Sequence, residues 1–230
     1  MHFSLITPEP GHERDAAHEW TRGAYEAHQW LWRFLPAPAG TARSFLFRRR
    51  DADGLPRFYV VSDREPVAPS PHWQVTSKAY SPALAAGDVL AFDLRANPVV
   101  TSRNAEGKAA RHDVVMQEKT RLLQERGLVK WADWLTPDRP ALPDLVQRTG
   151  AAWLQARCQR LGFALDDEAA LRVEGYEQHR GKSGALRMST LDFSGRLRVV
   201  DPTALRQTLF SGIGHAKAFG CGLLLVRPIG

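Results

Sequence analysis

The first hundred residues alternate between short runs of β-forming side chains and one long segment of helical periodicity. Residues 2–7 predict a strand, which the prolines and glycine at positions 8–11 end. A long helix is expected next, because apolar residues recur every three or four positions up to the break at Pro36. Its buried face would consist of Ala17, Trp20, Ala24, Ala27, Leu31 and Leu35.

A hairpin is expected after this helix. Residues 44–48 and 57–62 are rich in Phe, Tyr and Val, and the Asp-Ala-Asp-Gly sequence at 51–54 is a turn signal. A short helical turn near residues 82–86 then leads into a predicted strand over 88–100. Strand, helix, strand, strand, helix, strand is the order of a ferredoxin-like domain.

The second half of the chain repeats this order loosely. The expected elements are a strand over 111–115, helices over 116–126 and 144–161, paired strands over 171–176 and 186–200, a helix over 203–210 and a strand over 221–227. Residues 128–143 contain three prolines and two tryptophans and are interpreted as an insertion loop. We therefore predict an α+β protein with two tandem ferredoxin-like (RRM-like, βαββαβ) domains, residues 1–97 and residues 98–230.

Composition favours a polyanionic partner. The formal net charge of the 230 residues is +6, which places nucleic acid ahead of an acidic membrane. Cys158 and Cys221 form no CxxC pattern, so neither a disulfide framework nor a zinc site is expected, and the reducing cytoplasm suits the chain. No apolar stretch is long enough to span a bilayer, and no export signal is recognised.

Histidine spacing predicts no metal site and no cofactor. No metal-ligand spacing with carboxylates or cysteines is found for His2, His12, His18, His72, His112 or His215.

A glycine-rich loop lies near the end of the chain, within the predicted second domain. Gly212, Gly214, Gly220 and Gly222 surround Lys217 between a predicted helix and the last strand. Glycines at this density let one backbone approach another and point N–H groups at an anion. A dinucleotide fingerprint is rejected because Lys217 occupies the third glycine position, and the run contains no Gly-Lys-Ser or Gly-Lys-Thr. A tight helix-to-strand joint remains the structural alternative.

The glycine-rich loop resembles the signature of the CRISPR repeat-cleaving ribonucleases. Its residue sequence closely resembles that of their CasE branch, the processing subunit of the Cascade complex. Residues 94–98 (Leu-Arg-Ala-Asn-Pro), followed by Lys108 and residues 111–115, look like the central CasE signature. Residues 25–36 are similar to the family's first-helix active-site motif, and residues 1–8 to its first strand. The extra residues from Gly11 to about Trp20 depart from the family pattern.

The resemblance implies a metal-independent endoribonuclease that recognises the CRISPR repeat stem-loop in precursor crRNA. It would cleave at the 3′ base of the stem, leave a 5′-hydroxyl and a 2′,3′-cyclic phosphate, and retain the crRNA with the other Cascade subunits. His28 would be the general acid or base, Tyr25 its partner and Arg33 a basic group near the cleaved phosphate. RNA carries its own nucleophile, the 2′-hydroxyl. A ribonuclease therefore needs only to align this hydroxyl with the adjacent phosphate and to transfer two protons. Tyr25 and His28, three positions apart, share one helix face.

RNA contacts are expected from the glycine-rich loop, from the central signature and from a basic turn at residues 179–184. A two-stranded ribbon tipped with cations can contact the end of an RNA stem or its phosphates. The candidate RNA-binding residues are Arg95, Arg103, Lys108, Arg111, Arg180, Lys182, Arg187, Gly212, Gly214, Lys217, Gly220 and Gly222. Two alternatives stay open: a catalytically inactive RNA-binding protein of the same fold, in which His28 is structural, and a DNA-binding module selected by charge.

Overall fold

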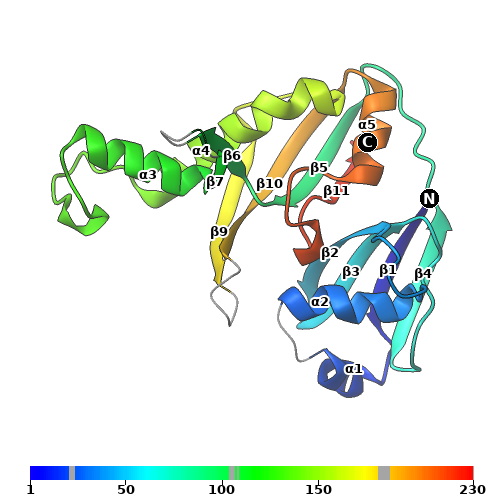
Figure 1. Ribbon diagram of the computed structural model, residues 1–230. Coiled ribbons are helices and arrows are strands. Elements are labelled where there is room, and N and C mark those ends of the chain that lie inside the picture. The colour runs from blue at the N-terminus through cyan, green and yellow to red at the C-terminus, as the bar shows by residue number, and fades with distance from the viewer. Residues whose placement is uncertain (21–23, 104–106, 108, 181–186, 230) are drawn as a thin grey trace. The chain divides into compact units, whose positions relative to one another are not determined.

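A computed structural model describes residues 1–20, 24–103, 107, 109–180 and 187–229 (Figure 1). The chain forms two compact units: unit 1 comprises residues 1–84 and 206–224, and unit 2 comprises residues 85–205 and 225–230. The glycine-rich loop belongs to unit 1. The division into folding domains near residue 97 stays a prediction. Within the described ranges, every helix is too short or too polar to cross a membrane.

Unit 1 is built on a four-stranded antiparallel sheet in the order β2-β3-β1-β4. The strands are β1 (His2–Pro8), β2 (Phe45–Ala52), β3 (Leu55–Ser62) and β4 (Trp73–Ala79). The predicted hairpin is confirmed, and Asp53 and Gly54 form its turn with φ of 55° and 75°. Positive φ at both turn residues matches the twist of the two strands.

The prediction for residues 82–100 is wrong in two respects. No helix forms at residues 82–86; instead the Asp88 carboxylate accepts a hydrogen bond from the Ala85 N–H at 2.8 Å, which favours a tight turn over a helix. The following strand, β5 (Val89–Ala96), pairs with strands of unit 2. The fourth strand of unit 1 is β4, which the sequence analysis missed because this edge strand buries little beyond Trp73.

The predicted long helix is replaced by two shorter ones, α1 (Glu13–Glu19) and α2 (Ala24–Leu31), which a 3₁₀ turn, η1 (Trp32–Phe34), follows. α1 ends at its C-cap, Trp20, and residues 21–23 lie outside the described residues. The rings of Trp20 and Trp30 both pack on Phe58, at 4.7 and 4.9 Å between centroids.

Of the predicted buried face, Trp20, Leu31 and Leu35 do lie in the core against the sheet. Ala17 was predicted wrongly, because it is exposed and its neighbour Ala16 is buried in its place. The side chains of Ala24 and Ala27 lie outside the described ones. Figure 1 shows α1 and α2 as separate helices.

Unit 2 has a second sheet in the order β11-β5-β10-β8, with β9 also paired to β10. The further strands are β8 (Phe163–Leu165), β9 (Arg172–Arg180), β10 (Arg187–Val199) and β11 (Leu224–Pro228). Helix α4 (Leu142–Cys158) packs on β9 and ends in the 3₁₀ turn η3 (Gln159–Leu161), and α5 (Pro202–Ser211) precedes the glycine-rich loop. The predicted α+β class with two ferredoxin-like domains is confirmed.

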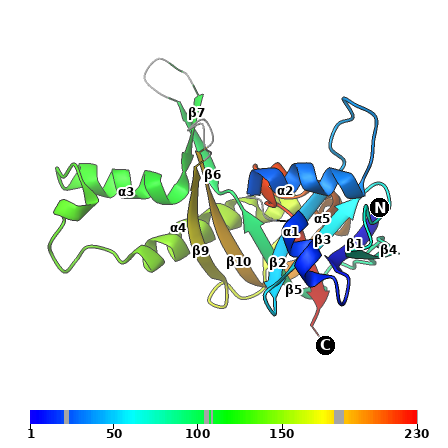
Figure 2. The same ribbon diagram turned by 90° about the horizontal axis from the view of Figure 1, so that it is seen from below.

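Unit 2 also contains an insertion between β5 and α4. The strands β6 (Val99–Arg103) and β7 (Ala109–Asp113) form a two-stranded sheet, and α3 (Val114–Glu125) follows at once. The Asp113 carboxylate caps α3 by accepting from the N–H groups of Val115 and Met116. Residues 128–141 hold only the short 3₁₀ turn η2 (Trp131–Asp133), and the last two residues of the predicted loop, 142 and 143, already belong to α4. Figure 2 shows α3 running beside α4.

Candidate active site

The glycine-rich loop closes on itself through its own backbone. The Ile213 N–H donates to the Gly222 carbonyl at 2.8 Å. A Cβ atom on Gly212 would lie 2.9 Å from that carbonyl oxygen, and one on Gly222 would lie 2.7 Å from the Ile213 carbonyl oxygen. Both glycines also have positive φ, 73° and 90°. This crossing of two backbone segments therefore requires glycine at both positions.

The loop lies against α2 and β2. Its short 3₁₀ turn, η4 (Lys217–Phe219), contacts both elements (Figure 1). A Cβ atom on Gly220 would come within 3.0 Å of the Phe47 ring of β2, so this glycine lets the loop approach the sheet closely. The fold thus brings Lys217 to the helix that carries His28, although the two residues are far apart in the sequence.

His28 is half-buried on α2 between aromatic rings. Its imidazole stacks on Phe45 at 5.8 Å between centroids and meets Trp32 edge-on at 6.2 Å. Burial, followed by the positive charge of Arg43, lowers the pKa of His28 below its ordinary value. The imidazole is therefore neutral at neutral pH. Within the described part of the chain, its buried Nε2 atom has no hydrogen-bond partner.

Arg43 lies just before β2 and is the part of this cluster that the sequence analysis missed. Its buried Nη1 atom has no hydrogen-bond partner among the residues that the structure describes. Its charge lowers the pKa of both His28 and Lys217. No spacing or motif singles out this arginine, because its importance follows from burial beside residues that are distant in sequence.

Lys217 is the second cation of the cluster. Its Nζ donates to the Ser211 carbonyl at 2.6 Å, and burial, followed by the Arg43 charge, lowers its pKa. Two partly buried cations that repel each other are stabilised when an anion binds near both of them. We refer to His28, Arg43 and Lys217 as the His28 cluster.

The other two predicted catalytic residues lie in α2 and in η1. Tyr25 lies three positions before His28 in α2, so the two positions share one helix face. Arg33 donates from Nη1 to Glu19 Oε2 at 3.3 Å. Arg33 is thus directed at the end of α1 by an ion pair that leaves its side chain 47% exposed.

The remaining predicted RNA-binding residues lie mostly in unit 2. Arg95 on β5 forms a two-pronged ion pair with Asp192 on β10, at 3.0 and 2.7 Å. Arg111 is exposed on β7. The backbone of Arg180 pairs with that of Arg187 at the ends of β9 and β10. Arg103 lies on β6, whereas Lys108 and Lys182 lie outside the described residues.

Comparisons with known proteins agree along the length of the chain. Residues 1–228 match the family described as CRISPR associated protein. The Cascade subunit CasE of the Escherichia coli K12 CRISPR system is 29% identical over 216 residues, which cover 93% of this chain and 96% of that protein. The CRISPR-associated endoribonuclease Cse3 of Thermus thermophilus is 30% identical over 225 residues, which cover 89% of this chain and 90% of that protein.

Solved structures give the same assignment. Thermus thermophilus Cse3, bound to an RNA representing a pre-cleavage complex, superposes with a TM-score of 0.66 at 27% identity, covering 99% of each chain. Cas6e from Escherichia coli K-12 superposes with a TM-score of 0.61 at 25% identity, covering all of both chains. The chain belongs to the CRISPR-associated protein family, in the branch that contains CasE and Cse3.

Proposed function

We propose that this protein is a metal-independent endoribonuclease that recognises the CRISPR repeat stem-loop in precursor crRNA and cleaves at the 3′ base of the stem. The observation that carries the proposal is the His28 cluster, a neutral imidazole beside two half-buried cations. Support comes from Cse3, which is named an endoribonuclease and was captured with RNA.

The partners follow from the same relatives. Because CasE is a Cascade subunit, we infer that this protein retains the cleaved crRNA and binds other Cascade subunits. The cytoplasm is the expected compartment, since it keeps thiols such as the buried Cys158 and Cys221 reduced.

In the proposed reaction, the neutral imidazole of His28 removes the proton of the RNA 2′-hydroxyl. The 2′-oxygen then forms a bond to the adjacent phosphorus, and the bond from phosphorus to the 5′-oxygen breaks. Tyr25 supplies the proton that the leaving 5′-oxygen takes up. The products are a 2′,3′-cyclic phosphate and a 5′-hydroxyl, and no metal or redox partner is needed to balance the step.

The two cations act on the phosphate. As the 2′-oxygen attacks, the phosphorane gains a second negative charge. Lys217, which the Ser211 carbonyl holds in place, and the half-buried Arg43 stabilise that charge. Arg33 is kept as a candidate basic group, although its ion pair with Glu19 must open for it to reach the phosphate. Proposed RNA-binding residues are Arg95, Arg103, Lys108, Arg111, Arg180, Lys182, Arg187, Gly212, Gly214, Gly220 and Gly222.

The test is to incubate the purified protein with its genomic repeat RNA in excess EDTA. We expect one cut, with a 2′,3′-cyclic phosphate on the upstream fragment, detected by its resistance to phosphatase until acid opens the ring. Intact RNA with full binding would favour the inactive RNA-binding alternative. Equal affinity for duplex DNA would contradict specific RNA recognition.

Arg43→Gln should shift the acid limb of the cleavage rate to higher pH. A general base loses activity as pH falls through its pKa, and the Arg43 charge keeps the His28 pKa low. Without that charge the pKa rises, although burial still holds it below its ordinary value. The measurement is the single-turnover rate at saturating protein from about pH 5 to about pH 8. Arg57→Gln on β3 is the control, and an identical limb in both variants would contradict the assignment.

A further inference from the structure

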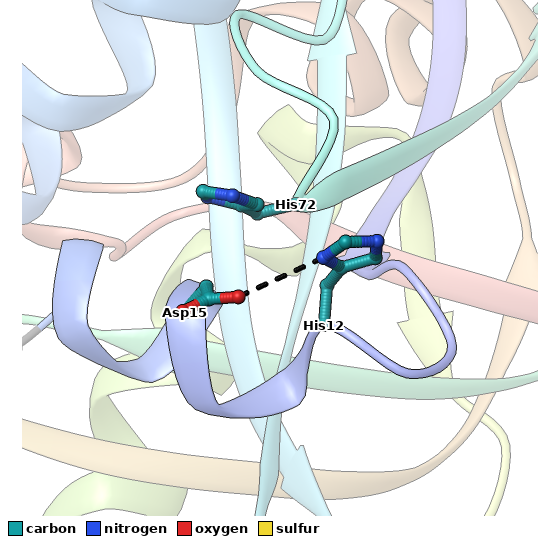
Figure 3. Close-up of side chains that lie close together, drawn as sticks. All are labelled: His12, Asp15 and His72. Atoms are coloured by element: carbon teal, nitrogen blue, oxygen red, sulfur yellow. Dashed lines mark ion pairs between the residues drawn. The ribbon is translucent and has the colours of Figure 1, made fainter.

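A second cluster of side chains that could bind a ligand lies in unit 1, and two of its three members, His12 and Asp15, belong to the segment that departs from the family pattern. His12 caps the start of α1, Asp15 lies in its first turn, and His72 directly precedes β4. Each offers one ligand atom, and these atoms lie within 4.8 Å of one another. Figure 3 shows the His72 ring facing the His12–Asp15 pair. The proposed cleavage uses none of these residues.

The spacing of the three side chains is close to that around a small cation. His12 Nδ1 lies 3.7 Å from Asp15 Oδ2, and the two imidazole rings are 5.5 Å apart between centroids. A tetrahedral ion with N and O ligands at about 2.1 Å holds its ligand atoms about 3.4 Å apart. A closure on the order of 1 Å is therefore needed. His12 and Asp15 can supply it by rotation, because their side chains are 45% and 56% exposed.

The imidazole of His72, the third ligand, is oriented by a hydrogen bond to Glu19. Glu19 Oε1 lies 2.9 Å from His72 Nδ1. An ionised carboxylate can only accept, so Nδ1 carries the hydrogen and Nε2 keeps its lone pair. Glu19 is itself fixed by the Ser70 hydroxyl at 3.0 Å and the Trp73 indole N–H at 3.1 Å. A carboxylate behind the ring is the support that metal-binding histidines usually have.

From this geometry we propose that His12, Asp15 and His72 bind a divalent transition-metal ion of the zinc class, with water completing the coordination. Two imidazoles and one carboxylate suit zinc and its first-row neighbours better than magnesium or calcium, which prefer oxygen ligands. The ion would tie α1 to the chain before β4. It would therefore fix the entry into the segment that leads to α2, and it takes no part in cleavage.

The test is a Co²⁺ titration of the full-length protein after removal of metal with EDTA and dialysis. We expect about one Co²⁺ per chain, with visible absorption bands of a four-coordinate N/O site that Zn²⁺ abolishes by competition. His12→Ala and Asp15→Asn should each weaken binding at least about 10-fold. Both positions are exposed, so both variants should fold, which far-UV circular dichroism would verify.

His18→Ala is the matched control, because His18 is an exposed histidine on the same helix. It should bind Co²⁺ like the unaltered protein. The proposal is overturned if the unaltered protein binds no Co²⁺, if His12→Ala and Asp15→Asn bind as tightly as it does, or if His18→Ala loses as much affinity. No RNA is present in this assay and cleavage is assayed in EDTA, so failure of either proposal leaves the other standing.

Discussion

His28→Ala is expected to lower the single-turnover cleavage rate by about 10³-fold while leaving repeat-RNA affinity nearly unchanged. Proton transfer by one positioned side chain contributes roughly 10²- to 10⁴-fold, and in the proposed reaction only His28 removes the 2′-hydroxyl proton. Binding should persist, because the cations that attract phosphate stay in place. The measurement is the cleavage rate at saturating protein, together with the repeat-RNA affinity from filter binding, for the variant and the unaltered protein.

A chemical rescue separates a catalytic His28 from a structural one. Removing the imidazole leaves a space against Phe45 and Trp32, which added imidazole can enter. Rescue that rises with the concentration of neutral imidazole indicates a base, whereas a loss through misfolding would not respond. His18→Ala should cleave normally. A His28→Ala protein that folds and cleaves within about tenfold of the unaltered rate would remove His28 from the mechanism.

The residues of the candidate site that came from the sequence lie in short segments. The resemblance to the family motif singled out Tyr25 and His28, whose roles stay a prediction. The glycine-rich loop is recognisable because its backbone crossing needs glycine at Gly212 and Gly222. Arg43 was missed because only the packing of the loop on α2 and β2 makes it part of a cluster. His72 was missed as a partner of His12 for the same reason, since the two residues lie far apart in sequence and only the fold brings them together.

The fold errors have similar causes. Helical periodicity continued through residues 17–35, yet α1 ends at Glu19. Periodicity did not reveal this end, because Trp20 at the C-cap and Trp30 in α2 both still pack on Phe58. The assignment of β5 to the first sheet failed because hydrophobic alternation identifies a strand but not its partner. Longer paired elements were predicted well, as β9 and β10 illustrate.

Lys217→Met should lower the cleavage rate by about 10²-fold, more than it weakens RNA binding. Methionine keeps most of the apolar stem of the lysine side chain. This stem packs beside Gly222, since Cγ of Lys217 would lie 3.3 Å from a Cβ atom there. The loop should therefore retain its shape. The lost group is the ammonium that Ser211 holds in place. Lys78→Met is the matched control, because Lys78 is an exposed lysine of β4 in the same unit.

The split between rate and affinity decides what Lys217 does. A cation that contacts the phosphate equally before and during reaction lowers affinity and the salt dependence of binding but leaves the saturated rate unchanged. A cation that meets the second phosphorane charge lowers the saturated rate, because that charge exists only in the transition state. The lowered pKa of Lys217 reflects its burial and, after that, the positive charge of Arg43. A bound phosphate would partly offset the repulsion between Lys217 and Arg43, and the more negative phosphorane would offset it further. Lys217→Met should therefore lower the cleavage rate more than it lowers RNA affinity.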